Sequence, residues 1–432
     1  MRFISTGGQP GAVTLREAAF KGLAPDGGLY VPETLSPLPA SFFKELSTLS
    51  LPEMATVVAA NILGDSLPEA VLQGICEEAF NFPVPLAEVT PGRYLLELFH
   101  GPSYAFKDFG ARFMARLLAY YLEQEARELH VLVATSGDTG GAVALGFLNV
   151  PGIKVSILYP SGKVSGLQEK QLTTLGGNIT ALEVDGNFDD CQRIVKAAFN
   201  DAELSRKHGL TSANSINICR LVPQSFYYFH ACAQLAEAQL PVVFSVPSGN
   251  FGNLCAGLLA KRIGLPVDHF VAATNANDVF VKYLESGNYN ARPSVRTLSN
   301  AMDVGDPSNY ARIAHLYNYD FTALRKDVFG HSVSDAETTA CIERVFAEHN
   351  YLLEPHAAVA WLGLEAYEKT LGRPFVAAAL GTAHPAKFMD VIPAQLAEKI
   401  VLPAGLQDAM QKEKKSIKIK PEFAELKAYL EG

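Results

Sequence analysis

From residue 94 onward, short apolar segments of strand length alternate with segments of helical periodicity, and this alternation constrains the fold more than any other feature. Strands that alternate with helices form parallel sheets with helices on both faces, so we expect an α/β protein. The predicted strands are Tyr94–Phe99, Leu129–Ala134, Lys154–Tyr159, Ile179–Val184, Val242–Val246, Phe270–Thr274 and Phe375–Leu380. The predicted helices are Phe109–Glu125, Gly141–Leu148, Val164–Leu175, Phe188–Phe199, Leu221–Glu237 and Asn253–Ile263.

Residues 1–93 have a different character, with many prolines and helical patterns near Leu15–Leu23, Phe42–Leu46 and Met54–Leu63. Prolines 83, 85 and 91 interrupt the chain before the alternating part begins. We therefore predict a separate, mainly helical N-terminal domain. Residues 275–333 are rich in Asn, Asp, Gly and Tyr and show no assignable pattern, and the basic stretch Lys412–Lys420 is typical of a solvated surface.

The charge balance limits the classes of partner. The chain has 432 residues, with 36 basic against 45 acidic side chains and a net charge of -9. This balance argues against nucleic acid or an anionic membrane as the main partner, although a small anionic substrate responds to local charge instead. The six cysteines form no CxxC pair, which indicates reduced thiols in a cytoplasmic protein and no zinc site. No apolar run of signal or membrane-span length is present, so we expect neither.

Lys107 lies at the junction between a predicted strand and a predicted helix, where α/β proteins expose reactive groups. Its neighbours Tyr104, Phe106 and Phe109 are aromatic and would exclude water from the amine. Desolvation lowers the pKa of a lysine, and such a lysine can form a Schiff base or act as a base. A solvated lysine whose stem covers the aromatic rings is the alternative that this stretch leaves open.

Three glycine-containing turns follow predicted strands, at residues 135–140, 247–253 and 380–387. The first, Thr-Ser-Gly-Asp-Thr-Gly, offers hydroxyl groups and free backbone N–H groups that suit a carboxylate or phosphate, or simply caps a helix. The second, Pro-Ser-Gly-Asn-Phe-Gly-Asn, could wrap a phosphate ester, yet has neither the P-loop nor the GxGxxG spacing. In the third, Thr382 could offer a neutral hydroxyl to a ligand.

A fourth element, Asn214–Arg220, precedes the predicted long helix. The guanidinium of Arg220 matches a phosphate dianion, and Asn214 and Ser215 add neutral donors. A helix cap beside an unrelated arginine is the alternative reading of this element. Together with Lys107, these four elements provide a lysine, a phosphate cradle, an anion-binding turn and a hydroxyl donor at strand ends, which is what a pyridoxal phosphate site requires.

The motifs resemble the threonine synthase family, in its long form from bacteria and fungi. They are His-Gly-Pro-Ser-Tyr-Ala-Phe-Lys-Asp-Phe-Gly, Thr-Ser-Gly-Asp-Thr-Gly, Ser-Ala-Asn-Ser-Ile-Asn, Ser-Val-Pro-Ser-Gly-Asn-Phe-Gly-Asn and Gly-Thr-Ala-His-Pro-Ala-Lys-Phe, and their order matches up to about Lys387. The resemblance implies the tryptophan-synthase-β-like fold, with two open parallel sheets and an extra N-terminal domain. It implies domains at 1–93, at 94–107 with 238–390 (large, cofactor-binding), at 108–237 (small) and an extension at 391–432.

The resemblance also implies roles for individual residues. Lys107 would hold pyridoxal 5'-phosphate covalently and Thr382 would face its pyridine nitrogen. The cofactor phosphate would lie in a loop formed by Ser248, Gly249, Asn250, Phe251, Gly252 and Asn253. The substrate would contact Thr135, Ser136, Gly137, Asp138 and Thr139 through its carboxylate, and Asn214, Ser215 and Arg220 through its phosphate. What contacts the ring hydroxyl of the cofactor stays open, because Asp138 stands where the broader fold class often has Asn.

The implied reaction converts O-phospho-L-homoserine and water into L-threonine and phosphate, in a monomer or homodimer. A phospho-lyase that releases 2-oxobutyrate from the same substrate would use the same residues. A non-catalytic protein that binds the cofactor or phosphate is the alternative from another class. It predicts a lost or blocked lysine, whereas Lys107 stands in its full motif.

Overall fold

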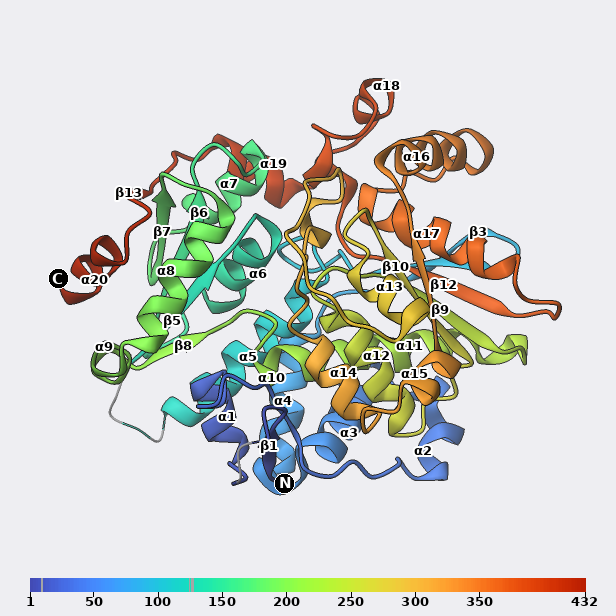
Figure 1. Cartoon of the computed structure of the whole chain (residues 1–432), viewed down its shortest axis with the longest axis horizontal. Helices are drawn as coiled ribbons and strands as arrows, with labels where there is room; N and C mark the ends of the chain where they lie inside the picture. Colours follow the sequence, from blue (N-terminus) through green and yellow to red (C-terminus); the bar gives the residue numbers. More distant parts are fainter. Residues whose placement is uncertain (9–10, 124, 126–127) are drawn as a thin grey trace.

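The computed structural model describes all residues except 9–10, 124 and 126–127. Two sheets lie side by side, and a layer of N-terminal helices lies below them in the view of Figure 1. The larger sheet has the strand order β11-β10-β9-β12-β4-β3, in which only the β3–β4 pair is antiparallel. The smaller sheet has the order β13-β7-β6-β5-β8 and is parallel throughout. The predicted α/β class with two open parallel sheets is confirmed, apart from the antiparallel edge.

The strands of the larger sheet are β3 (Leu86–Thr90), β4 (Arg93–Glu97), β9 (Val242–Pro247), β10 (His269–Thr274), β11 (Val328–Ser332) and β12 (Val376–Gly381). Those of the smaller sheet are β5 (Leu129–Ala134), β6 (Ile153–Pro160), β7 (Ile179–Val184), β8 (Leu210–Ser212) and β13 (Ile417–Ile419). The central strands are buried on both faces, as apolar runs between helices must be. The predicted bounds of β5 and β7 are reproduced. The edge strands β3, β8, β11 and β13 were not predicted, because they are short or half-polar.

The helices around the smaller sheet are α6 (Asp138–Phe147), α7 (Gly166–Thr173), α8 (Phe188–Asn200) and α9 (Ala202–His208). Those around the larger sheet are α12 (Gly252–Arg262), α13 (Val279–Ser286), α14 (Tyr310–Leu316), α15 (Phe321–Asp327), α16 (Asp335–His349) and α17 (Pro355–Glu368), with the short 3₁₀ turn η5 (Asn300–Met302) after α13. The unassigned segment 275–333 therefore contains α13 to α15 and β11. Helix α5 (Lys107–Leu122) packs mainly against α6.

The single long helix predicted at Leu221–Glu237 is wrong. The chain forms α10 (Ile218–Leu221), a 3₁₀ turn η3 (Val222–Ser225), α11 (Phe226–Leu235) and a second 3₁₀ turn η4 (Ala236–Ala238). Pro223 lies in the first turn, where its ring and its missing N–H interrupt the regular α-helical hydrogen bonds.

The N-terminal segment is mainly helical, as predicted, and also contains one antiparallel strand pair. Its elements are β1 (Phe3–Ser5), α1 (Leu15–Lys21), β2 (Tyr30–Pro32), α2 (Ala40–Glu45), η1 (Leu46–Thr48), α3 (Leu51–Leu63), η2 (Gly64–Ser66) and α4 (Glu69–Ala79). Phe80 stacks on Phe109 and Phe113 of α5 and meets Phe226 of α11 edge-on. The N-terminal helices thus share a hydrophobic core with the sheet-flanking helices, and the domain boundaries stay a prediction.

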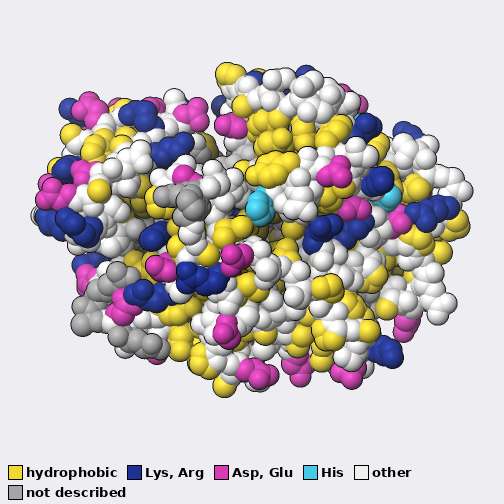
Figure 2. Space-filling view, turned by 60° about the horizontal axis from the view of Figure 1, so that its bottom comes forward, with side chains coloured by type: hydrophobic (Ala, Val, Ile, Leu, Met, Phe, Trp, Pro, Cys, Tyr) yellow, Lys and Arg dark blue, Asp and Glu magenta, His cyan; other side chains and the backbone are white. Residues whose placement is uncertain are grey.

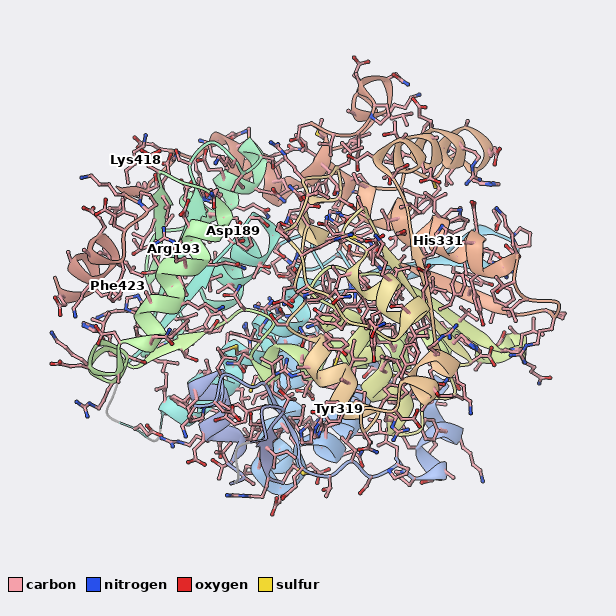
Figure 3. The ribbon with its side chains drawn as sticks, in the orientation of Figure 1. Asp189, Arg193, Tyr319, His331, Lys418 and Phe423 are labelled. Carbon is pink, nitrogen blue, oxygen red and sulfur yellow. The ribbon has the colours of Figure 1, made fainter. Side chains whose placement is uncertain are left out.

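The C-terminal segment crosses the molecule from the larger sheet to the smaller one (Figure 1). After β12 it forms η6 (Pro385–Phe388), α18 (Ala394–Ala397), α19 (Ala404–Gln411), β13 and α20 (Phe423–Glu431). Figure 3 shows Phe423 of α20 near Arg193 of α8, and Arg193 donates to the Pro421 carbonyl at 2.8 Å. In the basic stretch, Lys418 is largely exposed, whereas Lys414 pairs with Glu169 at 2.7 Å and Glu183 at 2.8 Å.

Acidic and basic side chains are interspersed over the face shown in Figure 2, as the near balance of charged residues suggests. Within the described ranges, the structure contains no helix with the length and apolar character needed to cross a membrane.

Leu426 tests whether the C-terminal helix stabilises the smaller sheet. It is fully buried in a cluster with Leu182, Ile194 and Ile419, which come from β7, α8 and β13. We expect Leu426→Ala to lower the free energy of unfolding by about 2–4 kcal/mol, because it removes apolar burial and leaves a cavity. Denaturant unfolding measures the change, with Glu431→Ala at an exposed position of α20 as control. If the free energy of unfolding of Leu426→Ala lies within about 0.5 kcal/mol of that of the control, α20 packs only loosely.

Candidate active site

The segment before Lys107 is held by the segment that follows β12. The Phe106 N–H donates to the Thr382 carbonyl at 2.9 Å, and the His384 N–H donates to the Tyr104 carbonyl at 3.0 Å. Tyr104 has a φ of 57°, a left-handed conformation that is uncommon for a residue with a side chain. Lys107 is the first residue of α5. Residues from the carboxyl ends of β4 and β12 therefore meet at the amine, as expected at the edge of a parallel sheet.

The Lys107 side chain is only 16% exposed, and burial lowers the pKa of its amine. The nearby Asp138 carboxylate opposes this shift, while the positive charges of Lys387 and Arg220 lower the pKa further. Of the three aromatic residues expected to exclude water, Phe106 places its ring centroid 5.3 Å from the amine. Phe109 instead points into the hydrophobic core and stacks on Phe80, and the Tyr104 hydroxyl accepts from the Gly405 N–H.

Asp138 is the acidic side chain beside Lys107. Its Oδ2 lies 3.7 Å from Lys107 Nζ, and its Oδ1 accepts from Lys387 Nζ at 2.7 Å and from Gln168 Nε2 at 2.8 Å. Burial alone would raise the pKa of this carboxyl group, but the two lysines outweigh it and hold the pKa well below its usual range. A permanently charged carboxylate would repel the carboxylate of a substrate, so the Asp138 side chain does not suit the contact implied by the sequence.

The loop at Ser248–Asn253 presents unused backbone donors. Among the described residues, the N–H groups of residues 249–253 have no protein acceptor. The left-handed residue is Phe251, with a φ of 58°, so the glycines are not required for a positive φ. Gly249 is required for packing instead, because a Cβ there would lie 2.5 Å from the Met302 Cα. A row of free N–H groups at the start of α12 suits a phosphate group.

The side chains of this loop mostly brace it. Asn250 Nδ2 donates to Ser215 Oγ at 2.6 Å, and Asn250 Oδ1 accepts from the Ser308 N–H at 2.6 Å. Asn253 Oδ1 accepts from Tyr227 and Tyr228, both at 2.6 Å, and the Ser248 hydroxyl donates to the Val246 carbonyl at 2.8 Å. The loop would therefore hold an anion mainly through its backbone.

The turn at Thr135–Thr139 has a similar character. Thr135 Oγ1 accepts from the N–H groups of Gly137 at 3.0 Å and Gly140 at 2.8 Å, so this hydroxyl stabilises the turn itself. The N–H groups of Ser136, Asp138 and Thr139 have no acceptor in the described part of the chain. These donors, and not the Thr135 side chain, are available for an anionic ligand.

The Asn214–Arg220 element lies against the cofactor loop rather than apart from it, because Ser215 contacts Asn250. Asn214 Nδ2 donates to the Ala134 carbonyl at 3.1 Å and ties the element to the end of β5. Arg220 is 4% exposed and donates to the Ala213 carbonyl, while its Nε is buried without a partner. Burial lowers the pKa of its guanidinium to about 10, with Asp108 partly opposing the shift.

Several buried polar atoms around these elements have no hydrogen-bond partner within the described part of the chain, which is costly unless a ligand supplies one. They are Ser103 Oγ, Asp108 Oδ1, Gln171 Oε1, Arg220 Nε, Gln224 Oε1 and Asn253 Nδ2. The hydroxyl of Thr382 likewise makes no hydrogen bond to the residues that the structure describes. These atoms, the free N–H groups and a desolvated lysine fit a polar, anionic cofactor such as pyridoxal phosphate.

No role is predicted from the sequence for Lys387, Gln168, Asn309 or Arg312. Arg312 is 1% exposed and donates to the carbonyls of Tyr30, Ser215 and Ile216, and Asn309 Nδ2 donates to the Asn250 carbonyl. The position of Lys387 directly after the third glycine-containing turn is a signal that could have identified it. Gln168, Asn309 and Arg312 lie in ordinary helical or loop sequence and carry no such signal.

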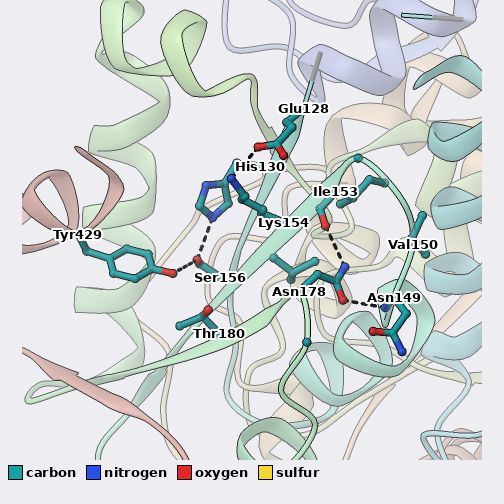
Figure 4. Close-up of a pocket in the computed structure, with 13 residues that line it drawn as sticks. Glu128, His130, Asn149, Val150, Ile153, Lys154, Ser156, Asn178, Thr180 and Tyr429 are labelled. Atoms are coloured by element: carbon teal, nitrogen blue, oxygen red, sulfur yellow. Dashed lines mark hydrogen bonds and ion pairs between the residues drawn. The ribbon is translucent and has the colours of Figure 1, made fainter. Parts of the chain in front are cut away.

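A pocket of about 580 Å³ lies elsewhere, at the amino ends of β5, β6 and β7 (Figure 4). His130 Nε2 is 2.9 Å from Ser156 Oγ, which is 3.0 Å from the Tyr429 hydroxyl of α20. This is the edge of the small sheet opposite to the one that carries Asp138, so the pocket is not part of the candidate active site.

The sequence matches the family described as "Pyridoxal-phosphate dependent enzyme" over residues 88–378. Residues 2–80 match "Threonine synthase N terminus" and residues 358–430 match "Threonine synthase, C-terminal". The chain is 45% identical over 422 residues to a threonine synthase from Haemophilus influenzae, covering 97% of this chain and 96% of the relative. It is 44% identical over 416 residues to that from Escherichia coli, covering 96% of both.

Solved structures agree. The crystal structure of threonine synthase from Escherichia coli superposes with a TM-score of 0.93 at 42% identity, covering 100% of this chain and 99% of that one. A threonine synthase from Brucella melitensis with bound pyridoxal phosphate superposes with a TM-score of 0.92 at 35% identity, covering 100% and 98%. The chain therefore belongs to the threonine synthase family of pyridoxal-phosphate-dependent enzymes.

Proposed function

We propose that this enzyme converts O-phospho-L-homoserine and water into L-threonine and phosphate. The observation that carries the proposal is that two elements able to bind a phosphate group accompany one desolvated lysine. The free N–H groups of residues 249–253 form one, and the buried guanidinium of Arg220 belongs to the other. A cofactor phosphate and a substrate phosphate need two such elements, whereas an unphosphorylated amino acid needs one.

Each group has a part in the proposed reaction. Bound pyridoxal phosphate supplies an electron sink for the negative charge left when a proton is removed next to the substrate amino group. The loop N–H groups would hold the cofactor phosphate, and the Thr382 hydroxyl would be the neutral partner for its ring nitrogen. The Lys107 amine, whose pKa is lowered by burial, takes the Cα proton. Arg220 stabilises the phosphate as its bond to the substrate carbon breaks and its charge increases.

The identity of the product tests the reaction. Incubation of the purified enzyme with O-phospho-L-homoserine should release phosphate and L-threonine in equal amounts. Release of phosphate with 2-oxobutyrate and ammonia in place of threonine would contradict the proposal.

All six cysteines are free and buried, which supports the expectation that the enzyme works in the cytoplasm.

Lys107→Ala should abolish threonine formation, with a loss of at least about a thousandfold, because the covalent anchor and the base are lost together. Phosphate release and threonine formation measure the loss, and circular dichroism checks that the fold persists. Lys369→Ala is a suitable control, because Lys369 is an exposed lysine at the end of α17. A Lys107→Ala variant that retains a tenth or more of the activity would exclude this role for Lys107.

Arg220→Met should lower kcat/KM for O-phospho-L-homoserine about ten- to a hundredfold, because charged hydrogen bonds contribute about 1.5–3 kcal/mol. Part of the loss should appear in kcat, since the charge on the phosphate increases as it leaves. Any slow reaction with an unphosphorylated amino acid should be far less affected. Arg116→Met is a matched control, because Arg116 is a half-buried arginine on α5 that donates to the Gly146 carbonyl. Equal losses with both substrates would assign Arg220 a structural role.

A further inference from the structure

Lys387 is a fully buried lysine whose ion-pair partner, among the residues described, is the carboxylate of Asp138. Its side chain is 0% exposed, and its Nζ donates to Asp138 Oδ1 at 2.7 Å and to the Ser103 carbonyl at 2.9 Å. The remaining carboxylate oxygen of Asp138 faces Lys107 at 3.7 Å, which is too long for a direct hydrogen bond. Lys387 thus takes the place that Lys107 would otherwise occupy as the partner of Asp138.

We propose that Lys387 is a positioning residue that neutralises Asp138 and so leaves the amine of Lys107 free to react. The inference rests on the proposed role of Lys107 as the reactive amine, and it adds a residue to which neither the motifs nor the comparisons assign a role. Lys387 acts through Asp138 and is not itself required to touch the substrate.

The protonation of the Lys107 amine depends on the sum of the charges next to it. Asp138 and Lys387 together contribute no net charge, and both are too deeply buried for water to screen them well. If Lys387 lost its charge, Asp138 would become an unpaired carboxylate beside Lys107 and would stabilise its ammonium form. If Asp138 lost its charge, Lys387 would destabilise that ammonium form.

The other charged groups near the three residues do not replace this pair. Arg220 is the further cation that acts on Lys107. Asp108 also faces Lys387 and is mostly charged at neutral pH, because burial raises the pKa of its carboxyl group only to about 6. The acid that acts on Lys107 is nevertheless Asp138. His356 acts on Asp138, and His384 faces Lys387 with its pKa lowered by burial to about 4. Asp138 is therefore the acid whose charge Lys107 senses, and Lys387 is its direct counter-ion.

The test is the titration of Lys107 in the full-length chain freed of cofactor. Competitive acetylation with acetic anhydride between pH 6 and pH 10, followed by mass spectrometry of the Lys107 peptide, reports the fraction of uncharged amine. The exposed Lys163 of the same chain serves as the internal reference. The method uses neither substrate nor turnover, so its outcome is independent of whether the proposed reaction is correct.

We expect Lys387→Met to slow acetylation of Lys107 about tenfold near neutral pH, equivalent to a rise of about one unit in its pKa, with an unchanged plateau at high pH. Asp138→Asn should accelerate acetylation at neutral pH. The double variant should lie close to the wild-type enzyme, because both charges are lost together. Lys369→Met, at an exposed position, should leave the titration unchanged.

A purely structural role of Lys387 would not produce this order of acetylation rates among the wild type, the two single variants and the double variant. Loosened packing would instead alter the access of the reagent to Lys107 at every pH. An unshifted titration in Lys387→Met would overturn the proposal. If that variant does not fold, the double variant decides, because it leaves no unpaired charge. A double variant that titrates like Asp138→Asn would show that the charge of Lys387 does not reach Lys107, and would equally overturn the proposal.

Discussion

The buried ion pair between Asp138 and Lys387 joins the two halves of the candidate active site. Asp138 begins α6 after a strand of the smaller sheet, and Lys387 follows the last strand of the larger sheet. Burying the Asp138 carboxylate or the Lys387 ammonium without the other would cost free energy. The two sheet edges therefore stabilise each other through this ion pair. Lys107 lies beside this pair, and its reactivity depends on a contact between two segments nearly 250 positions apart (387 − 138 = 249).

The site concentrates positive charge in a chain whose net charge is negative. Arg220 and Arg312 are both almost fully buried, and neither has an ion-pair partner among the described residues. Their protein acceptors are backbone carbonyls and, for Arg312, the side-chain oxygen of Asn309. Neutral acceptors satisfy the hydrogen bonds of a guanidinium but leave its charge uncompensated, which favours an anionic ligand. The local positive charge at the site, which favours an anionic ligand, is therefore not apparent from the net charge of the chain.

The C-terminal segment links the same two halves from outside the site. The Gly405 N–H at α19 donates to the hydroxyl of Tyr104, three residues before Lys107, at 3.2 Å. Beyond α19 the chain adds β13 to the smaller sheet and packs α20 on α8. Tyr104 adopts a left-handed conformation, and the surrounding contacts must compensate for this strain.

The sequence by itself determined the parallel α/β class, the central strands and the places where Lys107, the Ser248–Asn253 loop and the Thr135–Thr139 turn would lie. These predictions rest on local patterns, since hydrophobic periodicity and glycine-containing turns are read within a few residues of one another. The tertiary structure decided which side chains in those motifs face a ligand. Asn250 and Thr135 brace their own loops, Phe109 turns into the core, and Asp138 pairs with Lys387. The contacts of Thr135 are local, with Gly137 and Gly140. Those of Asn250, Phe109 and Asp138 join residues far apart in the chain, so no local pattern specifies them. Only the tertiary fold brings Lys387 to Asp138 and Ser215 to the cofactor loop.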